Sequence, residues 1–177
     1  MNTAPIVRPV LAEEHDRVAE LTLAAYRQLG LDVGPYRAAL ADVAGRAAAA
    51  PVFVAVRGSR VVGAVTYVPD RDNAYAEFDD TDAAGIRMLA VDPGAQGAGI
   101  GAALVDACVA RAIATGRGRV VLHSTVEMAA ARRLYRRLGF QRAPDRDWRP
   151  QPNVALHGYV LAIDIVAGAG PARSVGT

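Results

Sequence analysis

The chain has 177 residues, of which 52% are hydrophobic and 21% are charged, and its formal net charge at pH 7 is +2. This length and composition are typical of one soluble α/β domain and argue against a disordered or fibrous protein, while the small charge gives no indication of nucleic-acid binding. All twenty basic residues are arginines, so Schiff-base chemistry and the phosphate-binding P-loop, which both require lysine, are excluded.

The sequence predicts neither a membrane-spanning segment nor a metal site. No segment approaches the ~20 apolar residues of a membrane span, and the N-terminus, MNTAPIVRPV, lacks the basic and apolar regions of a signal peptide. Cys108 is the single cysteine, and the histidines His15, His123 and His157 are too dispersed to indicate a metal site. We therefore expect a cytoplasmic protein without metal, membrane or nucleic acid.

The first half of the chain predicts helices followed by a hairpin. Apolar residues recur at helical spacing in two segments, and two β-branched runs flank a "GS" pair that is typical of a tight turn. The expected elements are a strand over 5–10, helices over 11–29 and 36–49, and hairpin strands over 52–57 and 61–68. The segment 69–84 is acidic and turn-rich, so it should end the hairpin.

The second half predicts alternating strands and helices. The expected elements are a strand over 86–91, a helix over 98–115, a strand over 119–123, a helix over 127–138 and, after a proline-rich loop, a last strand over 159–166. The order β-α-α-β-β-β-α-β-α-β implies an α/β fold with a mixed sheet. Residues 1–166 are expected to form a single domain, and the small, polar segment 167–177 a flexible tail.

The stretch LAVDPGAQGAGIG, residues 89–101, places several glycines between a strand and a helix. Such a turn directs unpaired backbone N–H groups and the positive end of the helix dipole at one point, which attracts phosphate. Gly97, Gly99 and Gly101 lack the side chains that would keep an anion away from the backbone. The sequence therefore predicts a phosphate-binding turn.

A dinucleotide-binding turn is one alternative. Gly97, Gly99 and Ala102 fit the pattern G-x-G-x-x-G/A, but the acidic residue expected about 20 residues later is missing, since His123 and Ser124 stand there. An NAD(P)-binding oxidoreductase therefore stays open only as the second hypothesis.

Two motifs resemble a known family. VDPGAQGAGIGAALV resembles the acyl-CoA pyrophosphate loop of the GNAT N-acetyltransferases, Arg/Gln-x-x-Gly-x-Gly/Ala, and AAARRLYRRLGF resembles the later helix of that family, which ends in Leu-Tyr-x-x-x-Gly-Phe. The resemblance implies a GNAT-like acyl-CoA N-acyltransferase fold and transfer of the acetyl group of acetyl-CoA directly to an amine in a ternary complex. It leaves open an inactive member that binds CoA as a sensor.

By resemblance, the cofactor contacts fall on the strand and the turn. The backbone of Leu89, Ala90 and Val91 would pair with pantetheine. The N–H donors to the pyrophosphate would come from Gln96, Gly97, Ala98, Gly99, Ile100, Gly101 and Ala102. Met128 stands where the family often has Asn, so it either packs against the cofactor arm or belongs to the core.

The resemblance also suggests the catalytic groups. Tyr135 would donate a proton to the departing thiolate, unless it is only a packed core residue. The family often has a carboxylate that acts as the general base on the strand before the turn, but Gly85 stands at that position. Glu77 is therefore the best candidate for the general base, although the acidic segment that contains it could equally be a solvated loop. His123 either approaches the reaction centre or is structural. The expected partner is a small-molecule or peptide amine, and a homodimer stays open.

Overall fold

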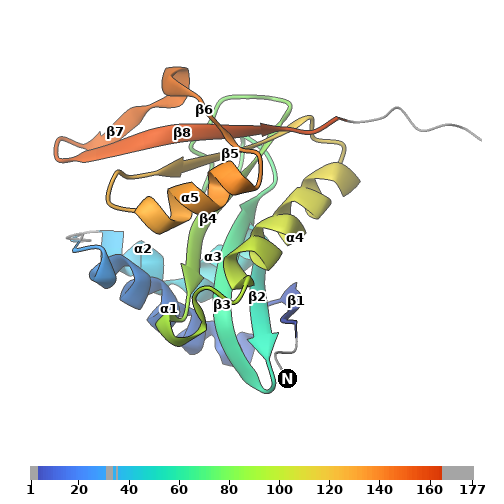
Figure 1. The fold of residues 1–177 in the computed structure, drawn as a ribbon, viewed down its shortest axis with the longest axis vertical. Helices are drawn as coiled ribbons and strands as arrows, with labels where there is room; N and C mark the ends of the chain where they lie inside the picture. Colours follow the sequence, from blue (N-terminus) through green and yellow to red (C-terminus); the bar gives the residue numbers. More distant parts are fainter. Residues whose placement is uncertain (1–3, 31–33, 35, 165–177) are drawn as a thin grey trace, which may run out of the picture.

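The computed structural model describes residues 4–30, 34 and 36–164 of the chain (Figure 1). The tail expected over 167–177 lies outside the described residues. The strands are β1 (Ile6–Pro9), β2 (Val52–Arg57), β3 (Arg60–Val68), β4 (Ala83–Val91), β5 (Arg119–Ser124), β6 (Gln141–Arg142), β7 (Trp148–Gln151) and β8 (Val154–Ala162). The helices are α1 (His15–Gln28), α2 (Tyr36–Ala41), α3 (Val43–Ala49), α4 (Ile100–Ala114) and α5 (Ala129–Arg137), with 3-10 turns η1 (Ala12–Glu14), η2 (Pro93–Ala95) and η3 (Pro144–Arg146).

These strands form one mixed sheet, as predicted. Their order is β1-β2-β3-β4-β5-β8-β6, with β7 paired to β8. Every pair is antiparallel except β4 and β5, which are parallel. Parallel neighbours need a long crossover connection, which α4 provides.

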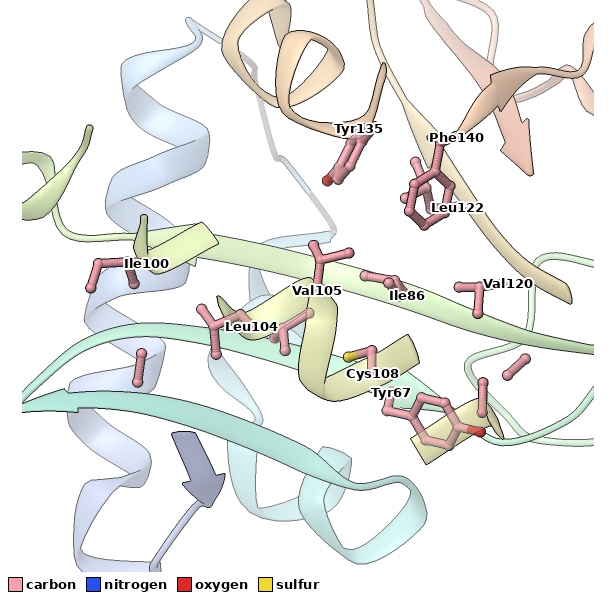
Figure 2. Packing of buried hydrophobic residues seen from close by; sticks show 14 of the residues in the cluster. Tyr67, Ile86, Ile100, Leu104, Val105, Cys108, Val120, Leu122, Tyr135 and Phe140 are labelled. Carbon is pink, nitrogen blue, oxygen red and sulfur yellow. The ribbon is translucent and has the colours of Figure 1, made fainter. Parts of the chain in front are cut away.

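Apolar side chains pack on both faces of the sheet. On one face, Leu104 from α4 and Tyr135 from α5 pack into a cluster with Leu122 of β5 (Figure 2). On the other face, Val18 from α1 and Val43 from α3 pack against the strands. The protein therefore has three layers, with the sheet between two sets of helices.

The parallel pair β4 and β5 separates toward its carboxyl ends. The two strands pair over Ala83–Ile86 and Arg119–Leu122, although β4 continues to Val91 and β5 to Ser124. The divergence is visible in Figure 1, where β4 runs down through the middle of the molecule and β5 runs sideways above it. Backbone groups at the end of β4 are therefore available on the side that faces β5.

The prediction of one helix over 36–49 was wrong. The chain forms α2 and α3 instead, because Asp42 leaves the helical conformation and its carboxylate accepts a hydrogen bond from the Gly45 N–H at 2.9 Å. A short polar side chain of this kind favours a helix start over a helix interior. The boundary was not visible in the apolar periodicity, which continues across it.

Two strand predictions were also inexact. The strand expected from residue 86 begins at Ala83, and the strand expected from residue 159 begins at Val154, with its predicted end beyond Asp164 outside the described residues. The early residues of β4 are fixed by pairing with the distant strand β5, whereas Val154 pairs with Gln151 of β7, three residues earlier, in a hairpin. β7 contains Pro150 and was expected to be a loop, but proline is tolerated on an edge strand.

No described helix combines the length and apolar character needed to cross a membrane.

Candidate active site

β4 contains one extra residue relative to β3, at Met88. The β3 residues Ala64 and Thr66 are two apart, whereas their partners Ala90 and Arg87 are three apart. Met88 adopts a left-handed backbone conformation with φ of 55°. A bulge leaves one residue outside the hydrogen-bond ladder and shifts the following side chains to the other face.

The glycine-rich turn leads from β4 into α4. Gly97 and Gly99 have φ of 77° and 78°, a conformation that glycine adopts without steric cost, and Gly99 is the N-cap of α4. A Cβ at either position would meet no atom within 4 Å, so the backbone is open there. The turn therefore has the geometry expected for binding an anion at a helix start.

Asp92 anchors the beginning of this turn. Its carboxylate accepts hydrogen bonds from the Gly94 N–H at 2.9 Å, from Arg17 of α1 at 2.5 Å and from Arg60 at 2.9 Å. The Gly94 N–H, followed by Arg17, holds the pKa of Asp92 below its usual value, so the carboxylate stays charged. The turn is thereby tied both to α1 and to the start of β3.

A groove of about 410 Å³ lies between the end of α1, the glycine turn and α5. Of the residues predicted to bind the cofactor, it is lined by Leu89, Val91, Gln96, Gly97, Gly99, Ile100, Gly101, Ala102 and Met128. Ala90 and Ala98 do not line it. Ala90 packs among the residues under α1, and Ala98 packs against the α4 side of the core.

α5 forms one wall of the groove through Ala131, Leu134 and Arg137. A Cβ on Gly101 would lie 2.9 Å from the Leu134 side chain, so glycine at this position lets α4 and α5 approach closely. Met128, the N-cap residue of α5, is half-buried in the same wall. Its side chain therefore faces the groove.

Tyr135 lies behind this wall. Its side chain is buried, and its ring packs 5.8 Å from Phe140 and 6.4 Å from Tyr159, measured between centroids. In Figure 2 its hydroxyl points away from Phe140, toward the side on which Val105 is drawn. The hydroxyl makes no hydrogen bond to any described residue, and burial raises its pKa, so the phenol stays protonated.

Glu77 is part of a polar cluster on the face of the sheet opposite α4. Its Oε1 lies 2.6 Å from Arg87 Nη2, and Arg87 also donates to the Tyr36 hydroxyl at 2.7 Å. Burial raises the pKa of Glu77, and Arg87 acts in the opposite direction. A largely buried carboxylate with an elevated pKa is a typical general base.

Phe78 positions this acidic segment against β4. A Cβ on Gly85 would lie 2.6 Å from the Phe78 ring, so only glycine lets the ring cover the strand at this point. Glu77 is thereby held next to the strand position that lacks a carboxylate of its own.

His123 completes the cluster from β5. Its Nδ1 lies 3.7 Å from Glu77 Oε2, and its Nε2 lies 2.9 Å from the Arg146 carbonyl oxygen. The Trp148 ring meets His123 edge-on, 6.4 Å away between centroids. Where β4 and β5 separate, the groove therefore lies on one face of the sheet and this polar cluster lies on the other face. Within the described residues, no group of three or more His, Cys, Asp or Glu side chains is placed to hold a metal ion.

Comparison with known protein families identifies the chain. The model of the acetyltransferase (GNAT) family matches residues 15–140, which include α1, the glycine turn and α5. The chain belongs to the GNAT acetyltransferase family. A search of curated proteins found no match.

Solved GNAT structures share the fold. A GNAT acetyltransferase from Staphylococcus aureus Mu50 is 14% identical with a TM-score of 0.72, covering 90% of this chain and 99% of that one. The ribosomal-protein-alanine N-acetyltransferase of Brucella melitensis is 18% identical, with a TM-score of 0.67 and coverage of 89% and 99%. The yncA protein of Salmonella typhimurium, solved with its cofactor acetyl-CoA, is 19% identical, with a TM-score of 0.67 and coverage of 97% and 99%. The predicted GNAT-like fold is confirmed.

Some members of this GNAT site were not predicted. Arg87 and Tyr36 contact each other, and Tyr26, which lines the groove, lies 6.1 Å from the Tyr36 ring. Arg87 did carry a signal, because it is the single charge in the otherwise apolar and small run AAGIRMLAV of β4. The tyrosines carried none, because their meeting depends on how α1 and α2 fold against the sheet.

Proposed function

We propose that the protein is an N-acetyltransferase that moves the acetyl group of acetyl-CoA directly to an amine in a ternary complex. The observation that carries the proposal is the groove, in which an open glycine turn at the start of α4 adjoins the free edge of β4. The Salmonella relative, solved with acetyl-CoA, supports the choice of cofactor.

The chain's own backbone would hold the cofactor. N–H groups of the turn from Gln96 to Ala102 suit the pyrophosphate, and the free edge of β4 at Leu89 to Val91 suits the amide-bearing pantetheine arm. When bound, acetyl-CoA supplies an activated acetyl group and a thiolate leaving group. The bulge at Met88 leaves backbone N–H groups that can polarise the thioester carbonyl.

Glu77 would accept the proton of the substrate ammonium. Burial raises the pKa of this carboxyl group, which makes it a stronger base, and the Arg87 ion pair fixes its orientation. The deprotonated nitrogen then attacks the acetyl carbon. Its second proton leaves to solvent as the amide forms, so that one ammonium and one thioester give one amide, one thiol and one proton.

Tyr135 would protonate the leaving thiolate. A phenol of pKa ~10 is a weaker acid than a thiol of pKa ~8.5, so proton transfer to the thiolate is uphill. Burial raises the pKa of Tyr135 and so increases the free-energy cost of this transfer. The same burial raises the pKa of a thiol, as it does for Cys108 in the neighbouring core, so the two pKa values shift together. The proton transfer then depends on the position of the hydroxyl.

Direct transfer is favoured by the location of the single thiol. Cys108 is fully buried within α4 and its pKa is raised, so it cannot act as a nucleophile that carries the acetyl group. The acceptor class is proposed as a primary amine on a small molecule or a peptide. The Brucella relative, named for a ribosomal-protein alanine, supports the peptide choice.

The first test is a thermal-shift titration with CoA, acetyl-CoA and NADH. A ligand at a hundred times its dissociation constant stabilises the fold by ~2.7 kcal/mol, which corresponds to an increase in Tm of about 5–10 °C for a chain of this size. We expect the shift with CoA and acetyl-CoA. A shift with NADH alone would favour an oxidoreductase.

The second test is thiol release from acetyl-CoA in the presence of Ala-Gly-Gly, spermidine, kanamycin or lysine. Turnover with one of these amines is expected. Binding of CoA without turnover with any amine of the four classes would favour a sensor.

A further inference from the structure

The Glu77 and His123 side chains approach each other without forming a hydrogen bond. Their Oε2 and Nδ1 atoms are 3.7 Å apart, which is too long for a hydrogen bond, and the side chains are 16% and 5% exposed. Neither atom makes a hydrogen bond to a described residue, and neither belongs to the fully buried side-chain atoms that lack a partner. Solvent therefore reaches both atoms, and each can accept a hydrogen bond from a ligand.

The tautomer of His123 follows from its other nitrogen. The Arg146 carbonyl oxygen, 2.9 Å from Nε2, can only accept a hydrogen bond, so Nε2 carries the hydrogen. In the neutral ring, Nδ1 then holds a lone pair and points it toward Glu77. Both atoms are therefore acceptors, and a nitrogen placed about 2.9 Å from each, beside the line that joins them, can donate one hydrogen to each.

We propose that His123 Nδ1 and Glu77 Oε2 together bind the amine of the acceptor substrate, each accepting one of its N–H bonds. The proposal rests on the proposed N-acetyltransferase function and adds His123 as a residue that contacts the substrate. Glu77 takes the proton of the ammonium, while His123 keeps its hydrogen bond to the resulting neutral amine and stays unprotonated. The nitrogen lone pair is thereby left free to attack the thioester.

The charges around His123 are consistent with a neutral ring. Burial lowers the pKa of His123, and the guanidinium groups of Arg87 from β4 and Arg146 from η3 add to this. Asp147 and the hydrogen bond to the Arg146 carbonyl act in the opposite direction. Glu77 is the other charge that faces the ring, and Gly158, its partner on β8, carries none.

The tautomer is measured on the wild-type protein without substrate. Long-range ¹⁵N–¹H correlation spectra at pH 7 distinguish the two imidazole nitrogens, and with three histidines in the chain the spectrum of His123→Gln assigns the signal. We expect a proton on Nε2, an unprotonated Nδ1 and a pKa below 6.5. A proton on Nδ1 would overturn the proposal, whatever the enzyme's activity.

The functional test uses His123→Gln, because the amide N–H of glutamine can still donate to the Arg146 carbonyl while the acceptor at Nδ1 is lost. With the best amine of the four-substrate screen, kcat/KM for the amine should fall about 10- to 100-fold, as expected for losing a hydrogen bond to a charged group. The Kd for acetyl-CoA and the Tm should not change. The acid limb of the pH profile, which requires two unprotonated groups in the wild type, should require one in the variant.

His15→Gln, at the start of α1, is the matched control and should match the wild type. Wild-type kcat/KM for the amine in His123→Gln would refute the role of His123 and leave the acetyltransferase proposal intact. If the wild type itself turns over no amine, the proposed function fails, while the tautomer measurement still decides the geometry.

Discussion

The Tyr135 side chain is buried and its hydroxyl makes no hydrogen bond to a described residue, so removal of the hydroxyl should leave no other group unpaired. Tyr135→Phe is expected to lower kcat by about 10²- to 10⁴-fold, the usual contribution of a positioned acid. The Kd for acetyl-CoA and the Tm should stay unchanged. Tyr159→Phe removes a hydroxyl from the adjacent buried ring and serves as the control. Nearly full kcat in Tyr135→Phe would make the residue part of the core only.

Glu77→Gln tests the proposed base through pH dependence. Because burial raises the pKa of Glu77, the acid limb of kcat/KM in the wild type should lie above its usual value of 4.5. The variant should lose much more activity at pH 7 than at high pH, where the substrate amine deprotonates without help. Steady-state rates from pH 6 to 10 measure this. A loss that is equal at every pH would remove Glu77 from the proton transfer.

At the scale of elements, substitutions at two glycines can distinguish the cost of backbone strain from an effect on CoA binding. Gly99 and Gly116 have φ of 78° and 71°, and a Cβ at either would meet no atom within 4 Å. Alanine at each position should therefore cost a similar ~1–2 kcal/mol in stability. Only Gly99→Ala should also raise the Kd for CoA, by at least about tenfold, because Gly116 follows α4 at its other end. Calorimetric titration of both variants checks this, and equal CoA affinities would contradict binding at the turn.

The contact between Gly85 and Phe78 predicts a second effect on the acidic segment. Gly85→Ala should push the Phe78 ring away and move Glu77 with it, lowering kcat/KM for the amine while the Kd for acetyl-CoA is unchanged. The added substitution Phe78→Leu should restore part of the activity by making room for the methyl group. An unaffected kcat/KM in Gly85→Ala would show that Phe78 does not position Glu77.

The elements that the sequence predicted well are those with strong local patterns. α4 and α5 end within two residues of the expected boundaries, and the hairpin turn falls on Gly58 as expected. The start of β4 at Ala83, which depends on the distant strand β5, was missed, and so was the start of β8 at Val154, which pairs with the proline-containing strand β7. For the candidate site, Leu89 and the turn follow from local motifs, whereas the meeting of Glu77 with Arg87 and His123 depends on the tertiary fold.

At the scale of the whole molecule, arginine–carboxylate pairs connect distant segments. Asp80, 11% exposed, accepts hydrogen bonds from Arg119 of β5 at 2.8 Å and from Arg146 of η3 at 2.7 Å. Although burial opposes it, these arginines and a backbone N–H keep the pKa of Asp80 below its usual value. A lowered pKa stabilises the fold above the unfolded value of 3.8, and this contribution is lost as the pH falls through the folded pKa.

Asp80→Asn should therefore lower the Tm at pH 7 by about 4–8 °C, since ~2 kcal/mol is typical for a lost charged hydrogen bond. The difference between variant and wild type should be constant above pH 3.8 and should shrink as the pH falls from 3.8 through the lower folded pKa, where the wild-type carboxylate becomes protonated too. Thermal unfolding followed by circular dichroism at neutral pH and at a series of pH values below 3.8 measures it. A difference that stays constant over the whole series would assign the loss to packing.

Because β4 and β5 pair only over Ala83–Ile86 and Arg119–Leu122, the sheet consists of two parts joined by this short parallel ladder. After Ile86, the β4 amides that face β5 have no neighbouring strand to protect them from solvent. A pantetheine chain bound along β4 would take the place of the absent strand. Deuterium uptake at the amides of Leu89 and Val91 should then slow when CoA binds, and uptake at the paired residues Ala83–Ile86 and Arg119–Leu122 should slow as well. The cofactor would then also hold the two parts of the sheet together.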